Sequence, residues 1–254
     1  MMNNITPVVK QLLILNVIFF IGSQIPSTHA YQLFSEFFFE NPNFKIWQPI
    51  TSMFMHAPLP NFTHILFNMI ALFSFGSALE HFWGGPKFLF FYISCGLGAT
   101  FLNEGIHYYQ YQHALSLLHE ANVSQQDIMA MLTQGKPTFK MLDAIPLSDL
   151  QDMYQAYNSQ TIGASGAIYG LLVAFAFMFP SAELGIMFIP IPIKAKYFVP
   201  GLLAVDLFLG FRGQSIFGAG STGIAHFAHI GGALTGFIMM LIWRKNQFKH
   251  NRWN

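Results

Sequence analysis

Long apolar runs separated by polar segments dominate the hydrophobic pattern of the chain. A helix that crosses about 30 Å of hydrocarbon needs on the order of 20 mostly apolar residues. Six runs come close to this length, at residues 8–25, 64–82, 87–102, 165–179, 197–211 and 225–243. The pattern therefore predicts an all-α polytopic membrane protein with a bundle of six transmembrane helices.

The composition supports a membrane location. Of the 254 residues, 53% are hydrophobic and only 9% are charged, whereas soluble domains contain about 25% charged residues. The net charge of +1 leaves no basic excess for phosphates, so nucleic acid is not an expected partner. The single Cys95 excludes an intramolecular disulfide and a cysteine-built zinc site. An ordinary soluble enzyme is thereby excluded, and the oligomeric state stays open.

Basic residues are divided unequally between the two sides of the predicted bundle. If the N-terminus is cytoplasmic, eight lie inside and four lie outside, where eight acids accompany them. This asymmetry follows the positive-inside rule and places both termini in the cytoplasm. The inside residues are Lys10, Lys87, Lys194, Lys196, Arg244, Lys245, Lys249 and Arg252, and the outside residues are Lys45, Lys136, Lys140 and Arg212.

Three predicted helices carry polar side chains at their outer ends. The run at 64–82 opens with His64 and Asn68, which lie four residues apart and so share a helix face. The run at 165–179 opens with Ser165 and Tyr169 at the same spacing. The last run carries one stripe of residues three to four apart, namely His226, His229, Gly232 and Gly236.

Counting residues places these polar groups at one depth. Ser165 lies fifteen residues before Pro180 and His229 fifteen residues before Arg244, which places both roughly 22 Å above the inner boundary. His64 and Asn68 bracket that level. Two G-x-x-x-G pairs would let the fourth and sixth helices approach closely enough for Ser165 and His229 to meet. These pairs are Gly166 with Gly170 and Gly232 with Gly236.

Each of these residues also has a structural interpretation. A serine in a membrane helix usually bonds the carbonyl one turn back, an intramembrane histidine is often a packed or pore-lining residue, and an asparagine can tie helices together. The common depth of these residues favours a catalytic role over the structural ones. Acyl transfer needs a nucleophile, a base that titrates near neutrality and donors for an oxyanion. Ser165, His229 and the His64/Asn68 pair offer these three roles.

Three motifs on the expected helices resemble the rhomboid intramembrane serine proteases. They are Gly-Ala-Ser-Gly at 163–166, His-x-x-x-Asn at 64–68 and His-x-x-Gly-x-x-x-Gly at 229–236. The resemblance implies a Ser165 nucleophile, a His229 general base, and an oxyanion hole formed by His64, Asn68 and the Ser165 backbone N–H. It also implies that Tyr169 packs on the His229 ring and that Gly166, Gly170, Gly232 and Gly236 permit close packing.

The resemblance further implies that the chain cuts transmembrane protein substrates near the outer boundary of a lipid bilayer. The expected location is the bacterial plasma membrane, and no metal or other cofactor is expected. One departure concerns the first outer loop, where many members have Trp-Arg and this chain has Trp47 followed by Gln48. Two rival functions stay open, a catalytically silent rhomboid-like binder and a His-lined transporter.

A third catalytic member would be an acid. Asp206 is the only acid in the interior of a predicted membrane helix, away from its ends, so the logic of a catalytic triad points to it. Counted from Lys196, it lies at a depth near 15 Å, below His229. We therefore expect a dyad and a structural hydrogen bond at Asp206.

The segment at 104–160 departs from the resemblance and is expected to be an insertion on the outer face. Apolar residues at helical spacing predict a few short amphipathic helices, the first around residues 114–121. Ser124 with Asp127 and Ser148 with Gln151 are capping-box starts. The expected domain organisation is a single membrane domain over residues 1–254, with the insertion docked over the outer mouth of the catalytic cavity.

Overall fold

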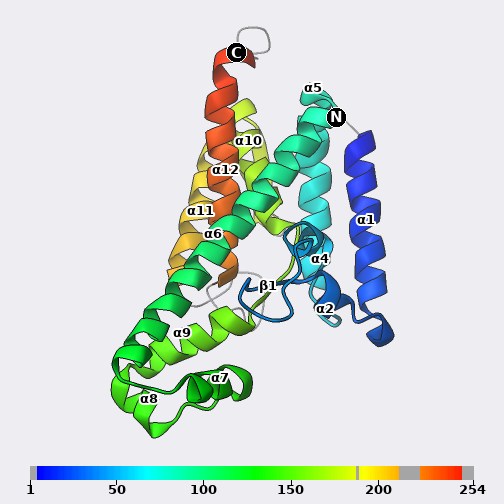
Figure 1. The fold of residues 1–254 in the computed structure, drawn as a ribbon. Coiled ribbons are helices and arrows are strands. Elements are labelled where there is room, and N and C mark those ends of the chain that lie inside the picture. The colour runs from blue at the N-terminus through cyan, green and yellow to red at the C-terminus, as the bar shows by residue number, and fades with distance from the viewer. Residues whose placement is uncertain (1–4, 187–188, 212–223, 248–254) are drawn as a thin grey trace.

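A computed structural model describes residues 5–186, 189–211 and 224–247 of the chain, most of them in helices (Figure 1). Arg212, Lys249 and Arg252, which entered the charge count, lie outside the described residues. The elements in chain order are α1 (Pro7–Ser23), η1 (Pro26–Thr28), α2 (Ala30–Phe34), β1 (Glu36–Phe37), α3 (Gln48–Thr51), η2 (Ser52–Phe54), α4 (Phe62–Ala71), η3 (Leu72–Gly76), α5 (Ser77–Trp83), α6 (Gly85–Glu120), α7 (Gln125–Gln134), α8 (Phe139–Ala144), α9 (Leu147–Asn158), β2 (Gln160–Thr161), α10 (Ser165–Met178), β3 (Glu183–Ile186), β4 (Ile189–Lys194), α11 (Ala195–Phe211) and α12 (Ile224–Gln247).

Helices occupy all six apolar runs, but they differ in length. Three segments of the described chain are long and apolar enough to cross a membrane, namely Phe62–Trp83, Gly85–Glu120 and His226–Trp243. A fourth is possible if Pro7–Ser23 and Pro26–Phe34, which meet at a bend of 103°, form one broken span. The structure is thus mostly helical with three to four candidate membrane spans. The count of six spans stays a prediction.

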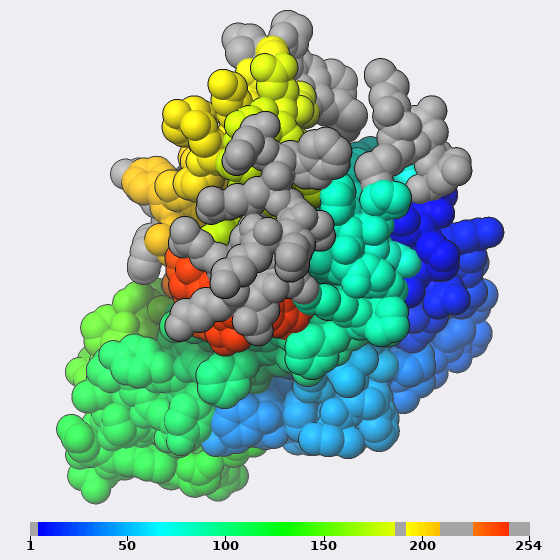
Figure 2. All heavy atoms as spheres, turned by 90° about the horizontal axis from the view of Figure 1, so that it is seen from above, coloured from blue at the N-terminus to red at the C-terminus, as the bar shows by residue number. Residues whose placement is uncertain are grey.

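The start of α1 and the end of α12 lie at the end of the bundle opposite the insertion. In Figure 1, α1 begins and α12 ends at the top, and α7, α8 and α9 lie at the bottom. Figure 2, seen from the top, shows the insertion on one side of the molecule and α1 on the opposite side. Helix α1 thus begins at the same end of the bundle at which α12 ends, and the side of the membrane that this end faces stays a prediction.

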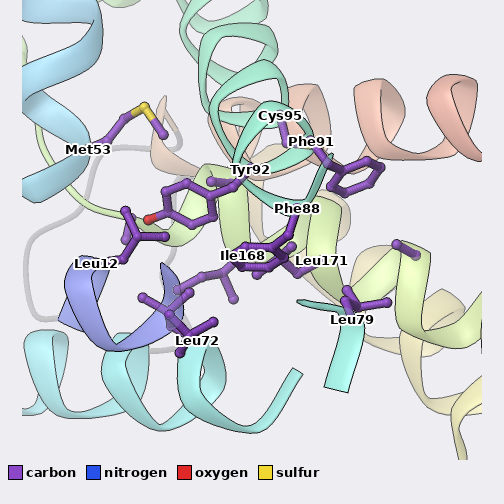
Figure 3. Close-up of a cluster of buried hydrophobic side chains, with 14 of the residues drawn as sticks. Leu12, Met53, Leu72, Leu79, Phe88, Phe91, Tyr92, Cys95, Ile168 and Leu171 are labelled. Atoms are coloured by element: carbon purple, nitrogen blue, oxygen red, sulfur yellow. The ribbon is translucent and has the colours of Figure 1, made fainter. Parts of the chain in front are cut away.

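The main core lies where α1, α5, α6 and α10 meet (Figure 3). Aromatic side chains of α6 fill it, because Phe88, Phe91 and Tyr92 are all fully buried. At the inner end of this core the Glu80 carboxylate accepts bonds from the first backbone N–H groups of α1, at 2.9 Å from Val8 and 2.8 Å from Val9. These donors have no partner within the helix, so the carboxylate caps α1 and fixes it to α5.

The insertion differs from its prediction at both ends. Instead of a separate first helix, α6 continues without a break to Glu120, because His107, Tyr111, Ala114 and Leu118 keep one buried stripe in phase with its membrane part. The cap at Ser124 is confirmed, since its side chain accepts a bond from the Asp127 N–H.

The predicted cap at Ser148 is wrong. Helix α9 begins at Leu147 with Pro146 as its N-cap, two residues earlier than predicted, and the fixed φ of proline suits a helix start. The Ser148 hydroxyl instead bonds the Asp149 carboxylate at 3.1 Å.

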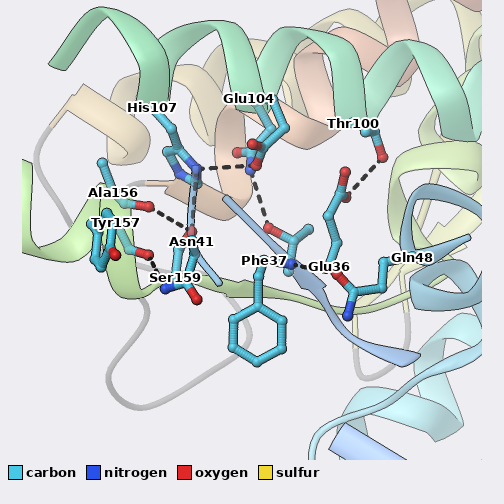
Figure 4. Close-up of polar contacts among 12 residues, drawn as sticks. Glu36, Phe37, Asn41, Gln48, Thr100, Glu104, His107, Ala156, Tyr157 and Ser159 are labelled. Atoms are coloured by element: carbon cyan, nitrogen blue, oxygen red, sulfur yellow. Dashed lines mark hydrogen bonds and ion pairs between the residues drawn. The ribbon is translucent and has the colours of Figure 1, made fainter. Parts of the chain in front are cut away.

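Polar side chains join the outer loop, α6 and the end of the insertion (Figure 4). Strand β1 pairs antiparallel with β2, with Glu36 opposite Thr161. The Thr100 hydroxyl donates to the Glu36 carboxylate at 3.0 Å, and the Asn103 amide donates to the Thr161 hydroxyl at 3.1 Å. Phe38 of the outer loop is buried in the core of the insertion. The insertion is therefore tied to the loop and to the strand that leads to Ser165.

Candidate active site

Ser165 and His229 meet near the first residues of α10 and α12. Ser165 is the first residue of α10, and its hydroxyl oxygen lies 2.9 Å from Nε2 of His229 on α12. Both side chains are only partly buried, with 15% of the His229 side chain exposed. The pair has the distance of a hydrogen bond and remains accessible to a ligand.

Glycines bring the two helices together. A methyl group on Gly232 of α12 would overlap the carbonyl oxygen of Gly166 on α10. One turn further along, a methyl on Gly236 would lie 2.9 Å from the Gly170 Cα. The two backbones therefore touch directly, as small residues at a helix interface permit, and this contact brings Ser165 within reach of His229.

Tyr169 lies one turn below Ser165 and stacks on the His229 ring. The ring centroids are 4.2 Å apart and the planes differ by 8°. Stacking fixes the plane of the imidazole, so the direction in which His229 presents Nε2 is restricted.

Asp206 contacts His229, contrary to the depth estimate. Its Oδ2 lies 2.8 Å from Nδ1 of His229, and its Oδ1 lies 2.5 Å from Nδ1 of His226. Counting residues placed Asp206 too deep because it assumes that every helix begins at the same level. Helix α11 follows the β3–β4 hairpin and does not meet this assumption. His226, three residues before His229 on α12, is 2% exposed and bonds the same carboxylate.

His64 presents a donor towards the nucleophile. Its Nδ1 accepts a bond from the Ala57 N–H at 3.0 Å, so the ring proton must be on Nε2. Nε2 in turn faces Gly163, because a methyl group built there would lie 3.2 Å from it and 3.5 Å from Oγ of Ser165. His64 and Ser165 thus flank one small space in which an oxyanion would find a donor.

The backbone before Ser165 supports the same space. Gly163 has φ +123°, a conformation that side chains rarely adopt, and its N–H donates to the Ser52 carbonyl at 2.9 Å. Because Ser165 is the first residue of α10, its own N–H has no partner within the helix. This N–H lies at the positive end of the helix dipole, which favours a negative ligand.

Asn68 is placed less directly. It is 7% exposed, and its amide donates to the carbonyl oxygen of His64 at 2.7 Å. One amide hydrogen is used by this bond and a second is left for a ligand. This position suits a supporting donor beside His64, and it also suits a side-chain hydrogen bond that only stabilises α4.

A second layer holds His64 from the outer loop. The His56 ring meets the His64 ring edge-on at 5.3 Å, and its Nε2 lies 2.8 Å from the side-chain oxygen of Asn16 on α1. Burial, with a smaller effect of His64, lowers the pKa of His56 to about 3. His56 is therefore uncharged at physiological pH and adds no positive charge beside His64.

Gln48, the departure noted in the sequence, forms a hydrogen-bonded hub in the loop before α4. It is fully buried, and its amide nitrogen donates to the carbonyl oxygens of Gln32 and Asn43 at 3.3 and 3.1 Å. Its oxygen accepts from the backbone N–H groups of Phe37 and Lys45. A neutral side chain with two donors and an acceptor thus ties the outer loop together without an ion pair.

One group of side chains in the described part of the chain could hold a metal ion. Asp206, His226 and His229 each offer a ligand atom, and these atoms lie within 4.8 Å of one another. Two imidazoles and a carboxylate suit zinc. The two Nδ1 atoms, however, lie at hydrogen-bond distance from the carboxylate, which leaves no room for an ion between them without movement.

The Rhomboid domain matches residues 43–118 and 139–246, more than half of the chain. The chain belongs to the rhomboid family. The family resemblance predicted from the motifs is thereby confirmed, and within the insertion only residues 119–138 fall outside the match.

Curated rhomboid relatives are distant. The chain is 26% identical over 200 residues to rhomboid protease AarA of Providencia stuartii, and this match covers 78% of the chain and 56% of the relative. It is 25% identical over 250 residues to presenilin-associated rhomboid-like protein A, mitochondrial, of Danio rerio, covering 94% and 50%. A shorter match of 36% over 69 residues, 26% of this chain and 33% of the relative, is to putative rhomboid protease YdcA of Bacillus subtilis. The chain spans about half the length of the first two.

Sequence reasoning considered one support of this rhomboid site, Asp206, but placed it too deep to reach His229, and it missed another, the bond from Ala57 to His64. The contact of Asp206 with both histidines had a signal, since His226 and His229 lie three apart on one face and Asp206 is the one acid in the interior of a run predicted to be a membrane helix. The bond from Ala57 to His64 had none, because it forms in an irregular turn where no periodicity exists.

Proposed function

We propose that this rhomboid is an intramembrane serine endopeptidase that cleaves transmembrane segments of membrane proteins near the outer boundary of the bilayer. The observation that carries the proposal is the 2.9 Å contact between Oγ of Ser165 and Nε2 of His229. Distant relatives that are named rhomboid proteases support the same reaction.

In the proposed reaction, Ser165 attacks the scissile carbonyl while His229 accepts its proton at Nε2. The carbonyl oxygen becomes an oxyanion that receives bonds from the His64 Nε2–H and the Ser165 N–H, with Asn68 as a supporting donor. His229 then gives the proton to the leaving amine. An acyl-enzyme remains, and water, activated by His229, releases the new carboxylic acid and restores Ser165.

The proposal includes the membrane arrangement. All six apolar helices cross a bacterial plasma membrane, both termini are cytoplasmic, and the site faces the outer side. The chain is one membrane domain in which residues 104–160 are an outer-face insertion that shapes substrate entry. Strand β2 supports this view, because Thr161 pairs with the outer loop only four residues before Ser165.

A rival function has one observation in its favour, the Asp206, His226 and His229 group that could bind a metal. A metal-binding transporter would use this group and would give Ser165 no role. The other rival, a catalytically silent binder, predicts a serine that does not react. Both rivals differ from the protease in the reactivity of Ser165.

A fluorophosphonate probe and a transmembrane substrate in proteoliposomes test the proposal. We expect the wild-type chain to be labelled and to cleave, with or without a chelator, and Ser165→Ala to do neither. Ser116→Ala, which changes an exposed serine on α6, is the matched control and should behave as wild type. Cleavage by Ser165→Ala, or loss of activity on chelation, would contradict the proposal.

A further inference from the structure

A buried carboxylate lies between two histidines of α12. Asp206 is 1% exposed, and each of its oxygens faces an imidazole nitrogen, Oδ1 facing His226 and Oδ2 facing His229. Because an ionised carboxylate only accepts hydrogen bonds, both Nδ1 atoms that face it must carry a proton. The contact therefore selects the tautomer of both rings.

The tautomer of His229 matters for catalysis. With its proton on Nδ1, the Nε2 that lies 2.9 Å from Ser165 Oγ has a free lone pair and can accept the serine proton. With its proton on Nε2, the ring could only donate to the serine oxygen and could not act as a base. A neutral imidazole without a neighbour has both tautomers, so a fixed acceptor on the Nδ1 side removes the unproductive one.

His226 fixes the carboxylate itself. A carboxylate with a single donor can turn about its last torsion, whereas donors at both oxygens set its plane. His226 and His229 lie three residues apart on one helix face, so a single helix supplies both donors. The two rings stand nearly perpendicular, at 82° and 6.3 Å, which places one at each oxygen.

We infer that Asp206 and His226 are positioning residues that hold the His229 imidazole in its base-competent tautomer and orientation. The inference rests on the proposed function of Ser165 and His229. It goes beyond a Ser-His dyad because it assigns the neighbouring polar groups a role in the rate of acylation. If these hydrogen bonds only joined α11 to α12 for folding, the rate of acylation would not depend on which nitrogen of His229 carries the proton.

Asp206→Asn separates these two roles. The amide keeps the size of the carboxylate but offers one oxygen and one NH2 group, so it cannot accept from both histidines. Whenever the NH2 group faces His229, the ring holds its proton on Nε2. We expect kcat and the rate of fluorophosphonate labelling to fall by about 10²–10⁴-fold with little change in KM, since the equivalent change in a soluble Ser-His-Asp protease lowers kcat by about 10⁴.

A matched pair at His226 gives a second, independent test. In His226→Asn the amide nitrogen can replace Nδ1 as the donor to Asp206, whereas His226→Leu has a similar size and no donor. We expect His226→Asn to retain a labelling rate within about threefold of wild type and His226→Leu to lose on the order of tenfold or more. Melting temperatures of all variants show how much of any loss comes from unfolding.

The outcomes separate this inference from the proposed function. If wild type is not labelled at Ser165, the proposed function is wrong, and the positioning role of Asp206 and His226 is wrong with it. If wild type is labelled and Asp206→Asn reacts equally fast, or if Asn and Leu at position 226 are equally slow at equal stability, only the positioning role is overturned. A fall in kcat at unchanged KM and melting temperature, with recovery by His226→Asn, supports it.

Discussion

The helices of this rhomboid that carry Ser165 and His229 and the insertion at residues 104–160 are packed in different ways. At the site, α10 and α12 touch through their backbones, because Gly232 faces the Gly166 carbonyl with no room for a methyl group. In the insertion, large side chains fill the space between the helices, and Leu118, Leu132 and Met153 are almost wholly buried there. Backbone contact fixes atomic positions but tolerates no added atom, whereas a side-chain core tolerates rearrangement. The site should therefore be much more sensitive to small changes than the insertion.

The largest effect is expected where backbones touch. Gly232→Ala places a methyl group on the Gly166 carbonyl oxygen, so α12 must move away from α10 and His229 must leave Ser165. We expect at least about a 10²-fold loss of cleavage and a lower melting temperature.

Gly105→Ala is the matched control, because no atom lies within 4 Å of the new methyl group. It should be neutral or stabilise α6 by about 0.5–1 kcal/mol. If both alanine variants cleave equally well, backbone contact does not determine the site.

The oxyanion donors should produce the next largest effect. His64→Ala removes a donor whose direction is fixed by Ala57, and a lost donor of this kind costs on the order of 10²–10³ in kcat. Asn68→Ala should cost less, since one of its amide hydrogens already bonds the His64 carbonyl.

Steady-state cleavage in proteoliposomes measures both effects, with His119→Ala on the exposed end of α6 as the control. Wild-type turnover in His64→Ala would show that His64 serves packing only.

The insertion should affect substrates more than chemistry. Replacing residues 121–146, which hold α7 and α8, by a short Gly/Ser linker leaves α6, α9 and the β1–β2 pairing in place. We expect several-fold changes in the relative cleavage of different transmembrane substrates, while Ser165 is labelled at the wild-type rate. A milder variant, Leu132→Ala, should cost about 2–5 kcal/mol of local stability in the insertion. Unchanged cleavage of every substrate would show that the insertion has no part in selection.

The same contrast explains how much could be predicted. Ser165, His229 and the glycines follow from helical periodicity, which fixes the face on which each residue lies. Asp206 was placed too deep because the level at which α11 begins depends on the hairpin before it, and no spacing within the helix reports this. The length of α6 was underestimated because its polar residues beyond Leu102 suggested an end, although its buried stripe continues in phase.

The smallest effect is expected at the junction between the two regions. Burial, and after it the charge of Glu104, raise the pKa of Glu36 from an ordinary value of 4.5 to about 8. Between these two values the folded protein binds more protons than the unfolded chain, so the stability contributed by Glu36 falls as pH rises through this window and is level above it. Glu36→Gln stays uncharged. Its advantage over wild type should be absent below pH 4.5, grow through the window and be complete above pH 8.

Melting temperatures at pH 5, 7 and 9 measure this change. One pKa unit corresponds to about 1.4 kcal/mol, so we expect a gain of at least a few degrees at pH 9. The neighbouring titratable groups, Glu104 and His107, are present in both proteins. Glu40→Gln, which neutralises an exposed acid of the same loop, should follow the wild-type pH dependence. If the melting temperature of Glu36→Gln shows the wild-type pH dependence as well, the fold does not hold Glu36 uncharged.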